Sequence, residues 1–254
     1  MKSFKSNLII LLLLPILVLR KLYYWHKTNK SFLPGKEFAE YGFEIGKKLL
    51  FKGKISPRLL FNPVSIVRYF EFNYANKYFE VIEHDRILDV SSPYLLGFYQ
   101  SSKFVIDDHY INPDRADLTN VISLSHKLNF KGNYSAKEID ALNLPFEDCY
   151  FDKIVSISVI EHIKDDGDSP ALKEMWRVLK PEGELILTFP VKNKYEIEYK
   201  SKDEYNLNLE KKTDRYFFQR IYDEQKIKER LLSSINNFEI ISKEIFGTTN
   251  KEFY

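Results

Sequence analysis

Residues 153–158 read KIVSIS, and residues 171–190 read ALKEMWRVLKPEGELILTFP. The first stretch is a short, mainly apolar run, as expected for a parallel strand that is buried on both faces. Ser169 and Pro170 precede the second stretch and favour the start of a helix. The turn Pro181-Glu182-Gly183 then leads into another apolar run. A strand, a helix and a second strand in this order indicate a parallel sheet.

The same alternation extends outward from this unit in both directions. We therefore predict an α/β fold over residues 81–254, with a Rossmann-like, mostly parallel sheet flanked by helices. Ligands of such sheets bind at the carboxyl ends of the strands. Further strands are predicted at 86–90 (RILDV), 103–106 (KFVI) and 134–139, and helices at 114–127 and 224–235.

The residues before this domain divide into two further segments. Residues 31–80 are predicted to form a helical cap region, with helices over 37–53 and from Pro63 to about Val81. Residues 1–30 combine an apolar run with basic residues and a linker. We predict that they form an N-terminal anchor.

Acidic residues fall at or just after three successive predicted strands. Asp89 lies in the first, Asp107 follows the second, and Asp140 follows the third; Asp108 is an alternative to Asp107. An acid after the second strand can accept hydrogen bonds from ribose hydroxyls, and one after the third can accept the adenine amino proton. An acid in the first can hold an ammonium group. Singly, each Asp is a common turn or cap residue.

At this point the sequence resembles a known family. The stretch DALNLPFEDCYFDKIVSISVIEHI over Asp140–Ile163, followed by Arg177-Val178-Leu179-Lys180-Pro181 and Gly183, resembles the class I S-adenosylmethionine-dependent methyltransferases of the UbiE type. The resemblance implies S-adenosyl-L-methionine as co-substrate. It also implies a cofactor-binding set, which comprises Asp89, Ser91, Asp107, Asp108, Asp140, Ala141 and Ser158.

The first loop departs from the family pattern. The family reads Asp-x-Gly-x-Gly-x-Gly, whereas Ser91, Pro93 and Leu95 replace the three glycines here. Glycine permits positive φ and close approach of a ligand to the backbone. Serine still has an N–H and a hydroxyl to offer, but Pro93 has no N–H. No G-x-G-x-x-G occurs in the chain, which disfavours a nicotinamide dinucleotide.

Methyl transfer from a sulfonium is an in-line displacement, so the enzyme mainly positions the nucleophile and excludes water. A hydroxyl acceptor also needs a general base. The predicted catalytic residues are His162 and Glu161; the competing interpretation is a structural pair at a helix start. His109 is a further candidate base, for which a loop position is favoured. No metal site is predicted: Asp165, Asp166 and Asp168 are interpreted as a solvated acidic loop that begins a helix, with a site for a hard cation as the alternative.

The charge distribution is uneven although the net charge is only +2. Residues 1–60 hold 12 Lys/Arg and 3 Asp/Glu, a net charge of +9. The run LIILLLLPILVL at Leu8–Leu19 is shorter than the roughly 20 apolar residues of a membrane span. An uncleaved anchor is ranked first, a buried helix second and a cleaved signal third. The anchor predicts a membrane-associated protein with its main domain in the cytoplasm, near anionic lipid; a soluble cytoplasmic protein is the alternative.

Two function hypotheses follow. The first is a methyltransferase acting on a small-molecule, sugar or lipid-linked acceptor. The second is a catalytically inert binding or scaffold protein at a membrane that retains the fold, suggested by the lost glycines. The chain contains no motif for nucleic-acid recognition.

Overall fold

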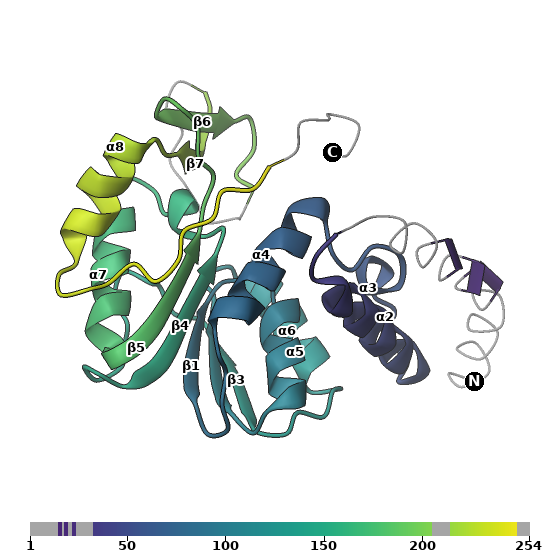
Figure 1. Cartoon of the computed structure of the whole chain (residues 1–254). Coiled ribbons are helices and arrows are strands. Elements are labelled where there is room, and N and C mark those ends of the chain that lie inside the picture. Colours follow the sequence, from purple (N-terminus) through teal and green to yellow (C-terminus); the bar gives the residue numbers. More distant parts are fainter. Residues whose placement is uncertain (1–14, 17, 20–21, 24–32, 205–213, 248–254) are drawn as a thin grey trace. The chain divides into compact units, whose positions relative to one another are not determined.

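The computed structural model describes residues 15–16, 18–19, 22–23, 33–204 and 214–247 (Figure 1). These residues form two compact units. The first contains the described residues up to Lys77, together with His126–Asn129 and the residues from Glu244 onward. The second contains Tyr78–Ser125 and Phe130–Lys243.

The first unit is built from helices α2 (Lys36–Phe51), α3 (Pro57–Phe61) and α4 (Ile66–Tyr78, which is in this unit up to Lys77). They confirm the predicted helical character of this region. Gly35 precedes α2 with a φ of 66°, and a Cβ there would lie 2.6 Å from the backbone oxygen of Tyr69 in α4. Glycine is therefore needed where α2 approaches α4.

The second unit confirms the predicted parallel sheet. Its strand order is β3-β2-β1-β4-β5, and every neighbouring pair is parallel. This is the order of the first five strands of a doubly wound sheet, with β1 in the middle. The strands are β1 (Arg86–Val90), β2 (Asp107–Ile111), β3 (Asn133–Lys137), β4 (Phe151–Ile157) and β5 (Leu179–Thr188).

Helices cover both faces of this sheet. Figure 1 shows α5 (Leu95–Lys103) and α6 (Arg115–Ser125) on one face and α7 (Asp168–Val178) on the other. Apolar side chains of β1 and β4 pack against α7, which contributes Ala171 and Met175 to the core. The alternating strand and helix segments thus bury the apolar runs from which they were predicted.

The predicted second strand at 103–106 is wrong. Helix α5 extends to Lys103, Val105 is 39% exposed, and the strand begins only at Asp107. The prediction relied on an apolar run, but this strand has the sequence DDHYI. Its polar residues are accommodated by neighbouring polar side chains, a pattern that hydrophobicity does not report.

The chain after β5 departs from a simple continuation of the sheet. Strands β6 (Glu196–Lys200) and β7 (Tyr216–Ile221) form a separate antiparallel hairpin. The predicted helix at 224–235 is present as the consecutive segments α8 (Glu224–Lys226), η2 (Ile227–Leu231) and η3 (Leu232–Ser234). Residues 238–246 contain no strand.

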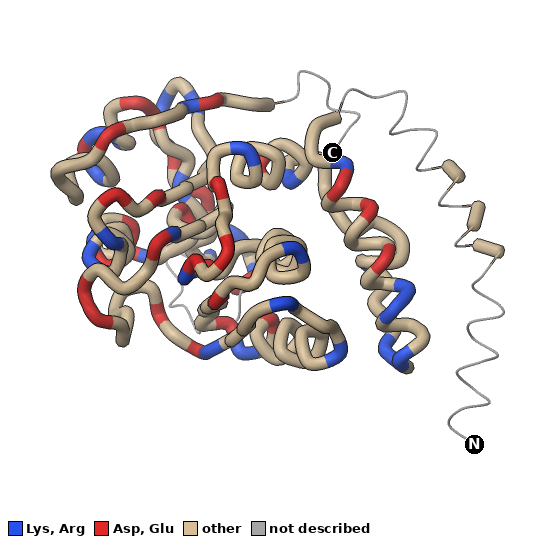
Figure 2. The backbone as a smooth tube through the Cα atoms, turned by 60° about the horizontal axis from the view of Figure 1, so that its bottom comes forward, with Lys and Arg blue, Asp and Glu red and all other residues tan. Residues whose placement is uncertain are grey.

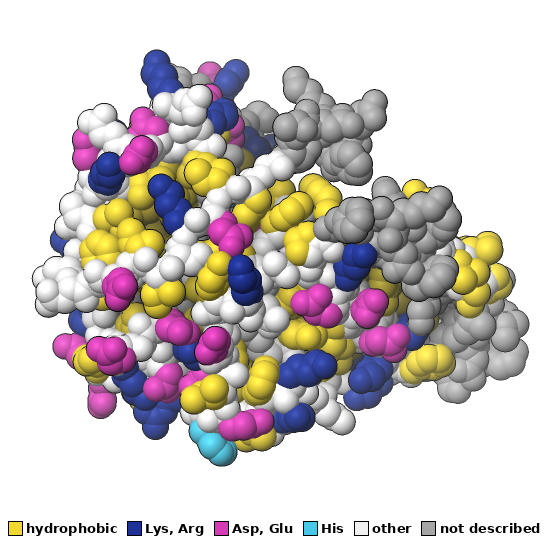
Figure 3. Space-filling view, in the orientation of Figure 1, with side chains coloured by type: hydrophobic (Ala, Val, Ile, Leu, Met, Phe, Trp, Pro, Cys, Tyr) yellow, Lys and Arg dark blue, Asp and Glu magenta, His cyan; other side chains and the backbone are white. Residues whose placement is uncertain are grey.

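The surface mixes charged and apolar side chains. Basic and acidic residues are interspersed along the described backbone (Figure 2). Hydrophobic side chains lie between charged ones on the face drawn in Figure 3. Within the described residues, no helix is both long and apolar enough to cross a bilayer. Most of the predicted anchor lies outside the described residues.

Candidate functional site

The carboxyl ends of the five strands form one edge of the sheet. Backbone hydrogen bonds join the residues that leave this edge: Ser91 N–H donates to Ile111 O at 2.9 Å, and Asn112 N–H donates to Lys137 O at 3.1 Å. Ser158 N–H donates to Thr188 O at 2.9 Å. The edge therefore brings together Ser91 and Ser158, both predicted, and Asn112, which was not.

At Ser91, the loop after β1 adopts the left-handed backbone conformation that favours glycine. Ser91 has a φ of 55°, in the left-handed region. Its hydroxyl and its N–H both donate to Ile111 O, each at 2.9 Å. The hydroxyl of Ser92 accepts from Ile157 N–H at 3.0 Å. Bonds to the neighbouring strands therefore hold this glycine-poor loop in place.

Asp89 supports this loop from below. It lies in β1, is 1% exposed, and accepts a hydrogen bond from Ser92 N–H at 2.8 Å. Burial raises the pKa of Asp89 to about 7, against the hydrogen bonds from Ser92 that lower it. The structure thus gives Asp89 a role in fixing the loop. The carboxylate of Asp89 is not exposed at the carboxyl edge of the sheet, where the sequence predicted an acid that could hold an ammonium group.

Asp107 is not at the carboxyl edge. It is the first residue of β2, at the opposite end of the strand, because the strand begins later than predicted. Burial acts to raise its pKa, but hydrogen bonds from His109 and Asn133 outweigh burial, and the pKa of Asp107 is lowered. Asp108, the alternative, is also within β2 and is 1% exposed beneath α5. Neither residue occupies the position expected for an acid that binds ribose.

Asn112 takes the position after β2 instead. It is 7% exposed, and its Nδ2 donates to the hydroxyl of Tyr110 at 2.9 Å and to Asp117 Oδ2 at 3.0 Å. Its Oδ1 accepts from Asp114 N–H, and Asp114 in turn caps α6 by accepting from Ala116 N–H at 2.8 Å. The sequence Asn112-Pro113-Asp114 is a signal for a turn and a helix start, and it could have located this strand end.

Asp140 and Ala141 follow β3 as predicted. Asp140 is exposed, and its Oδ1 accepts from Leu142 N–H at 2.9 Å, which shapes the turn after the strand. Ala141 is 7% exposed and belongs to the apolar core between the sheet and α7. An exposed carboxylate above a buried small residue is compatible with the predicted contact to an adenine amino group.

Glu161 and His162 lie in the short helix η1 (Ile160–His162), directly after β4. Nδ1 of His162 is 2.7 Å from the backbone oxygen of Phe218 in β7. Because a carbonyl oxygen only accepts, Nδ1 carries the proton in the neutral ring and Nε2 carries the lone pair. Nε2 lies 3.6 Å from Oε1 of Glu161, which is 1% exposed. This arrangement gives His162 a nitrogen that can accept a proton.

His109 does not share this position, and its assignment to a loop is wrong. It lies within β2, where the rings of Phe146, Tyr150 and Phe151 surround it edge-on. Its Nε2 is 3.0 Å from Asp107 Oδ2. Since Phe151 begins β4, His109 faces the interior away from the carboxyl edge, which removes it as a candidate base.

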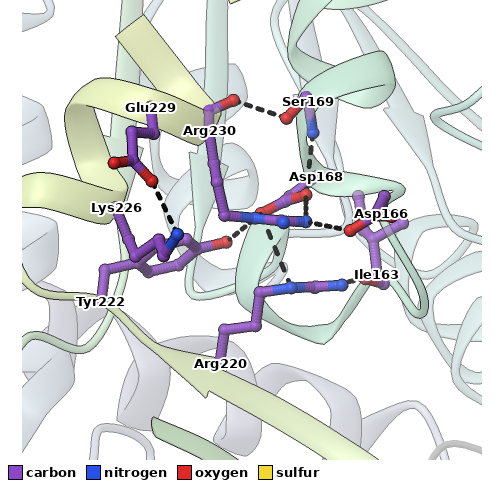
Figure 4. A network of polar contacts seen from close by, with 9 residues as sticks. All are labelled: Ile163, Asp166, Asp168, Ser169, Arg220, Tyr222, Lys226, Glu229 and Arg230. Atoms are coloured by element: carbon purple, nitrogen blue, oxygen red, sulfur yellow. Dashed lines mark hydrogen bonds and ion pairs between the residues drawn. The ribbon is translucent and has the colours of Figure 1, made fainter. Parts of the chain in front are cut away.

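A buried ionic network anchors the hairpin beside η1 (Figure 4). Asp168 is 0% exposed and accepts from the Tyr222 hydroxyl at 2.9 Å and from Arg230 Nε at 2.8 Å. Arg220 is 1% exposed, lies 3.6 Å from Asp168 and donates to Ile163 O at 2.5 Å. The interpretation of this acidic segment as solvated is therefore wrong for Asp168, although Asp166 is exposed.

Comparison with known proteins adds an independent observation. Residues 115–187 match the model of a methyltransferase domain. The chain is 36% identical over 84 residues to the ubiquinone/menaquinone biosynthesis C-methyltransferase UbiE of Pseudoalteromonas translucida, covering 33% of each protein. It is 30% identical over 101 residues to a putative methyltransferase of Encephalitozoon cuniculi, covering 37% of this chain and 48% of that protein. The matched regions thus span less than half of these curated relatives.

Two solved structures are also similar. One is a putative sarcosine dimethylglycine methyltransferase from Galdieria sulphuraria, with a TM-score of 0.40, 23% identity, and coverage of 43% of this chain and 40% of that one. The other is the [4+2]-cyclase SpnF, with a TM-score of 0.46, 20% identity, and coverage of 67% and 58%.

The matched residues 115–187 run from α6 to β5 and include Asp140, Ser158, Glu161 and His162. The parallel sheet, the helices on both of its faces and the methyltransferase sequence at its carboxyl edge agree with one another. Residues 115–187 therefore resemble the class I S-adenosylmethionine-dependent methyltransferases, and they lie within a parallel sheet of the Rossmann-like kind.

Proposed function

We propose that this protein transfers the methyl group of S-adenosylmethionine to a hydroxyl group of a small-molecule, sugar or lipid-linked acceptor, with His162 as the general base. The observation that carries the proposal is the lone pair on Nε2 of His162, fixed by the bond from Nδ1 to Phe218 O. The family match supports the methyl donor, because it includes the Asp140 segment.

The proposed reaction needs few groups of the protein. The acceptor oxygen attacks the methyl carbon in line with the departing sulfur, and Nε2 of His162 takes the hydroxyl proton. Glu161, buried beside this nitrogen, would stabilise the positive charge that develops on the imidazole ring. Asp140 would accept a hydrogen bond from the adenine amino group. The remaining contribution of the domain is to hold the two reactants in contact and to exclude water.

Binding of the donor can be tested by calorimetry. We expect S-adenosylmethionine and S-adenosylhomocysteine to bind, and NAD not to bind. Asp140→Ala should weaken both interactions by about 10- to 150-fold, because a hydrogen bond to a charged group contributes about 1.5–3 kcal/mol. Asp148→Ala is the matched control, since Asp148 is an exposed acid in the same connection that pairs with Arg177. Binding of NAD alone would overturn the proposal.

One observation favours the second hypothesis, an inert scaffold. The N–H and the hydroxyl of Ser91 both donate to Ile111 O. Neither donor is therefore directed at a ligand of this loop. The calorimetry separates the two hypotheses. If the wild-type chain binds neither adenosyl ligand and Ser91→Gly restores binding, the scaffold hypothesis replaces the enzyme.

Membrane attachment through residues 1–25 is a further part of the proposal. The apolar run and the net charge of +9 over residues 1–60 support it. We expect the full chain to sediment with membranes after cell fractionation and a chain lacking residues 1–25 to remain in the supernatant. A wash at high salt should release a chain held only by charge. If both chains stay in the supernatant at low salt, the attachment is wrong, and trimming near residue 25 would favour a cleaved signal.

A further inference from the structure

Two buried carboxyl groups converge beneath α5. A Cβ built on Gly97 would lie 3.0 Å from Oδ2 of Asp108 and 3.3 Å from Oδ2 of Asp89. Both residues are 1% exposed. The two oxygens thus approach the same point below the helix, and the absence of a side chain at Gly97 makes room for them.

The surroundings of the pair supply few compensating groups. Ser101 of α5 donates to Asp108 Oδ2 at 2.9 Å, and Ser92 N–H donates to Asp89 Oδ1 at 2.8 Å. Oδ1 of Asp108 and Oδ2 of Asp89 are buried and have no hydrogen-bond partner among the residues that the structure describes. The donors to the two carboxyl groups are therefore neutral groups of Ser92 and Ser101, and neither brings a positive charge.

The other titratable groups around the pair are also acidic. Tyr110 of β2 and Tyr134 of β3 face the pair. The charge of Asp107 in β2 raises the pKa of Asp108, and the charge of Asp117 in α6 raises the pKa of Tyr110 and Tyr134. In the part of the chain that is described, no Lys or Arg contributes to the pKa of Asp89 or Asp108. Two negative charges buried next to the same helix residue, Gly97, without a cation beside them, are strongly unfavourable.

We propose that Asp108 is a positioning residue that retains a proton at neutral pH, so that Asp89 alone carries the charge that holds the loop Ser91–Tyr94. The asymmetry follows from the hydrogen bonds. Asp89 accepts a backbone N–H bond from the loop, which favours its ionised form, whereas Asp108 accepts only from a hydroxyl. Burial raises the pKa of Asp108 to about 8, helped by the charge of Asp89, and burial raises that of Asp89 to about 7.

The inference rests on the proposed function where it concerns ligand binding, because the loop borders the proposed site for S-adenosylmethionine. Ionisation of Asp108 would place a second charge beside Asp89 and push the loop out of position. Affinity for S-adenosylhomocysteine should therefore fall above about pH 8, by up to about tenfold per pH unit for one proton.

The first measurement uses the full chain without ligand. Since the folded-state pKa values of both acids lie above the unfolded value of 3.8, the folded protein holds protons that the unfolded chain releases. This contribution to stability is complete below pH 3.8 and is lost as the pH rises through about 7 and 8. The melting temperature of the wild type should fall between pH 6 and 9, and Asp108→Asn should reduce the fall. Asp107→Asn is the control, because the pKa of Asp107 is lowered and it stays charged over this range.

The second measurement is the affinity for S-adenosylhomocysteine over the same pH range. Asp108→Asn, which is always neutral, should keep its affinity at pH 9, whereas Asp89→Asn should bind less tightly than the wild type above about pH 7, where Asp89 is ionised. An equal alkaline fall in wild type and Asp108→Asn, in both melting and binding, would overturn the inference. If no form binds the ligand at any pH, the proposed function fails while the melting curves still decide on the carboxyl pair.

A direct readout covers the case in which Asp108→Asn does not fold. The carboxyl carbon of Asp108 in the wild-type protein can be titrated by NMR. We expect a midpoint near 8. A midpoint near the ordinary aspartate value of about 4 would overturn the inference.

Discussion

His162→Asn is expected to lower the rate of methyl transfer by about 10²–10⁴-fold, the usual contribution of a general base, while affinity for S-adenosylmethionine remains nearly unchanged. The side-chain amide of asparagine can replace Nδ1 as a donor to Phe218 O, but it has no lone pair on nitrogen at the position of Nε2. The variant therefore separates the chemistry of the residue from its structural bond to the hairpin. A single-turnover assay with labelled donor measures the rate.

His162→Ala and His126→Gln complete this experiment. His126 is exposed, so its replacement should leave the rate unchanged. If His162 acts as the base, the alanine and asparagine variants lose a similar amount of activity. If asparagine retains most of the wild-type rate while alanine does not, the histidine serves to hold β7, and the proposed base is wrong.

Asp168→Asn is expected to destabilise the second unit by about 3–5 kcal/mol, as is typical when one partner of a buried ion pair is removed. The carboxylate is completely buried and accepts from Arg230 at 2.6 and 2.8 Å and from Tyr222 at 2.9 Å (Figure 4). The neutral amide would remove the negative charge that lies 3.6 Å from the buried Arg220. Unfolding by urea, followed by circular dichroism, measures the change in free energy.

Asp166→Asn is the matched control, because Asp166 binds the same Arg230 at 2.9 Å but is 92% exposed. An exposed pair contributes about 0–1 kcal/mol, so the control should unfold almost as the wild type does. Burial acts to raise the pKa of Asp168, but bonds and charges of Arg230, Arg220 and Tyr222 lower it below 3.8. The stability it provides is thus present above pH 3.8 and is lost as the pH falls through the lower folded value. Equal stabilities of the two variants would contradict the assigned role.

The fold was predictable where strands are apolar. β1 and β4 are short, largely buried strands, and their positions follow from the local runs of apolar residues in the sequence. β2 was misplaced because Asp108 and His109 lie inside it, held by a polar cluster and an aromatic cage that only the folded chain assembles. For the same reason, the sequence predicted Asp107 at the carboxyl end of a strand, whereas it lies at the amino end of β2.

The candidate site was predictable where a local motif fixes the geometry. Asp140 follows β3 and His162 follows β4 in one continuous segment of the chain, so both lie after the carboxyl end of a strand of the same parallel sheet. The partners of Asp168 were not predictable, because Arg230 is 62 residues away in sequence and no periodic pattern links the two. Such contacts depend on the position of the hairpin and of η2, which local propensity does not determine.

The left-handed serine at position 91 also changes how conformational entropy is divided between folding and binding. A non-glycine residue in this region costs roughly 1–2 kcal/mol in the folded chain, which its hydroxyl bond to Ile111 O partly offsets. A glycine there would leave the loop freer before a ligand arrives and would require more ordering on association. Here the loop is ordered when the domain folds, so a ligand meets a rigid surface and loses less of its binding free energy to immobilising the protein.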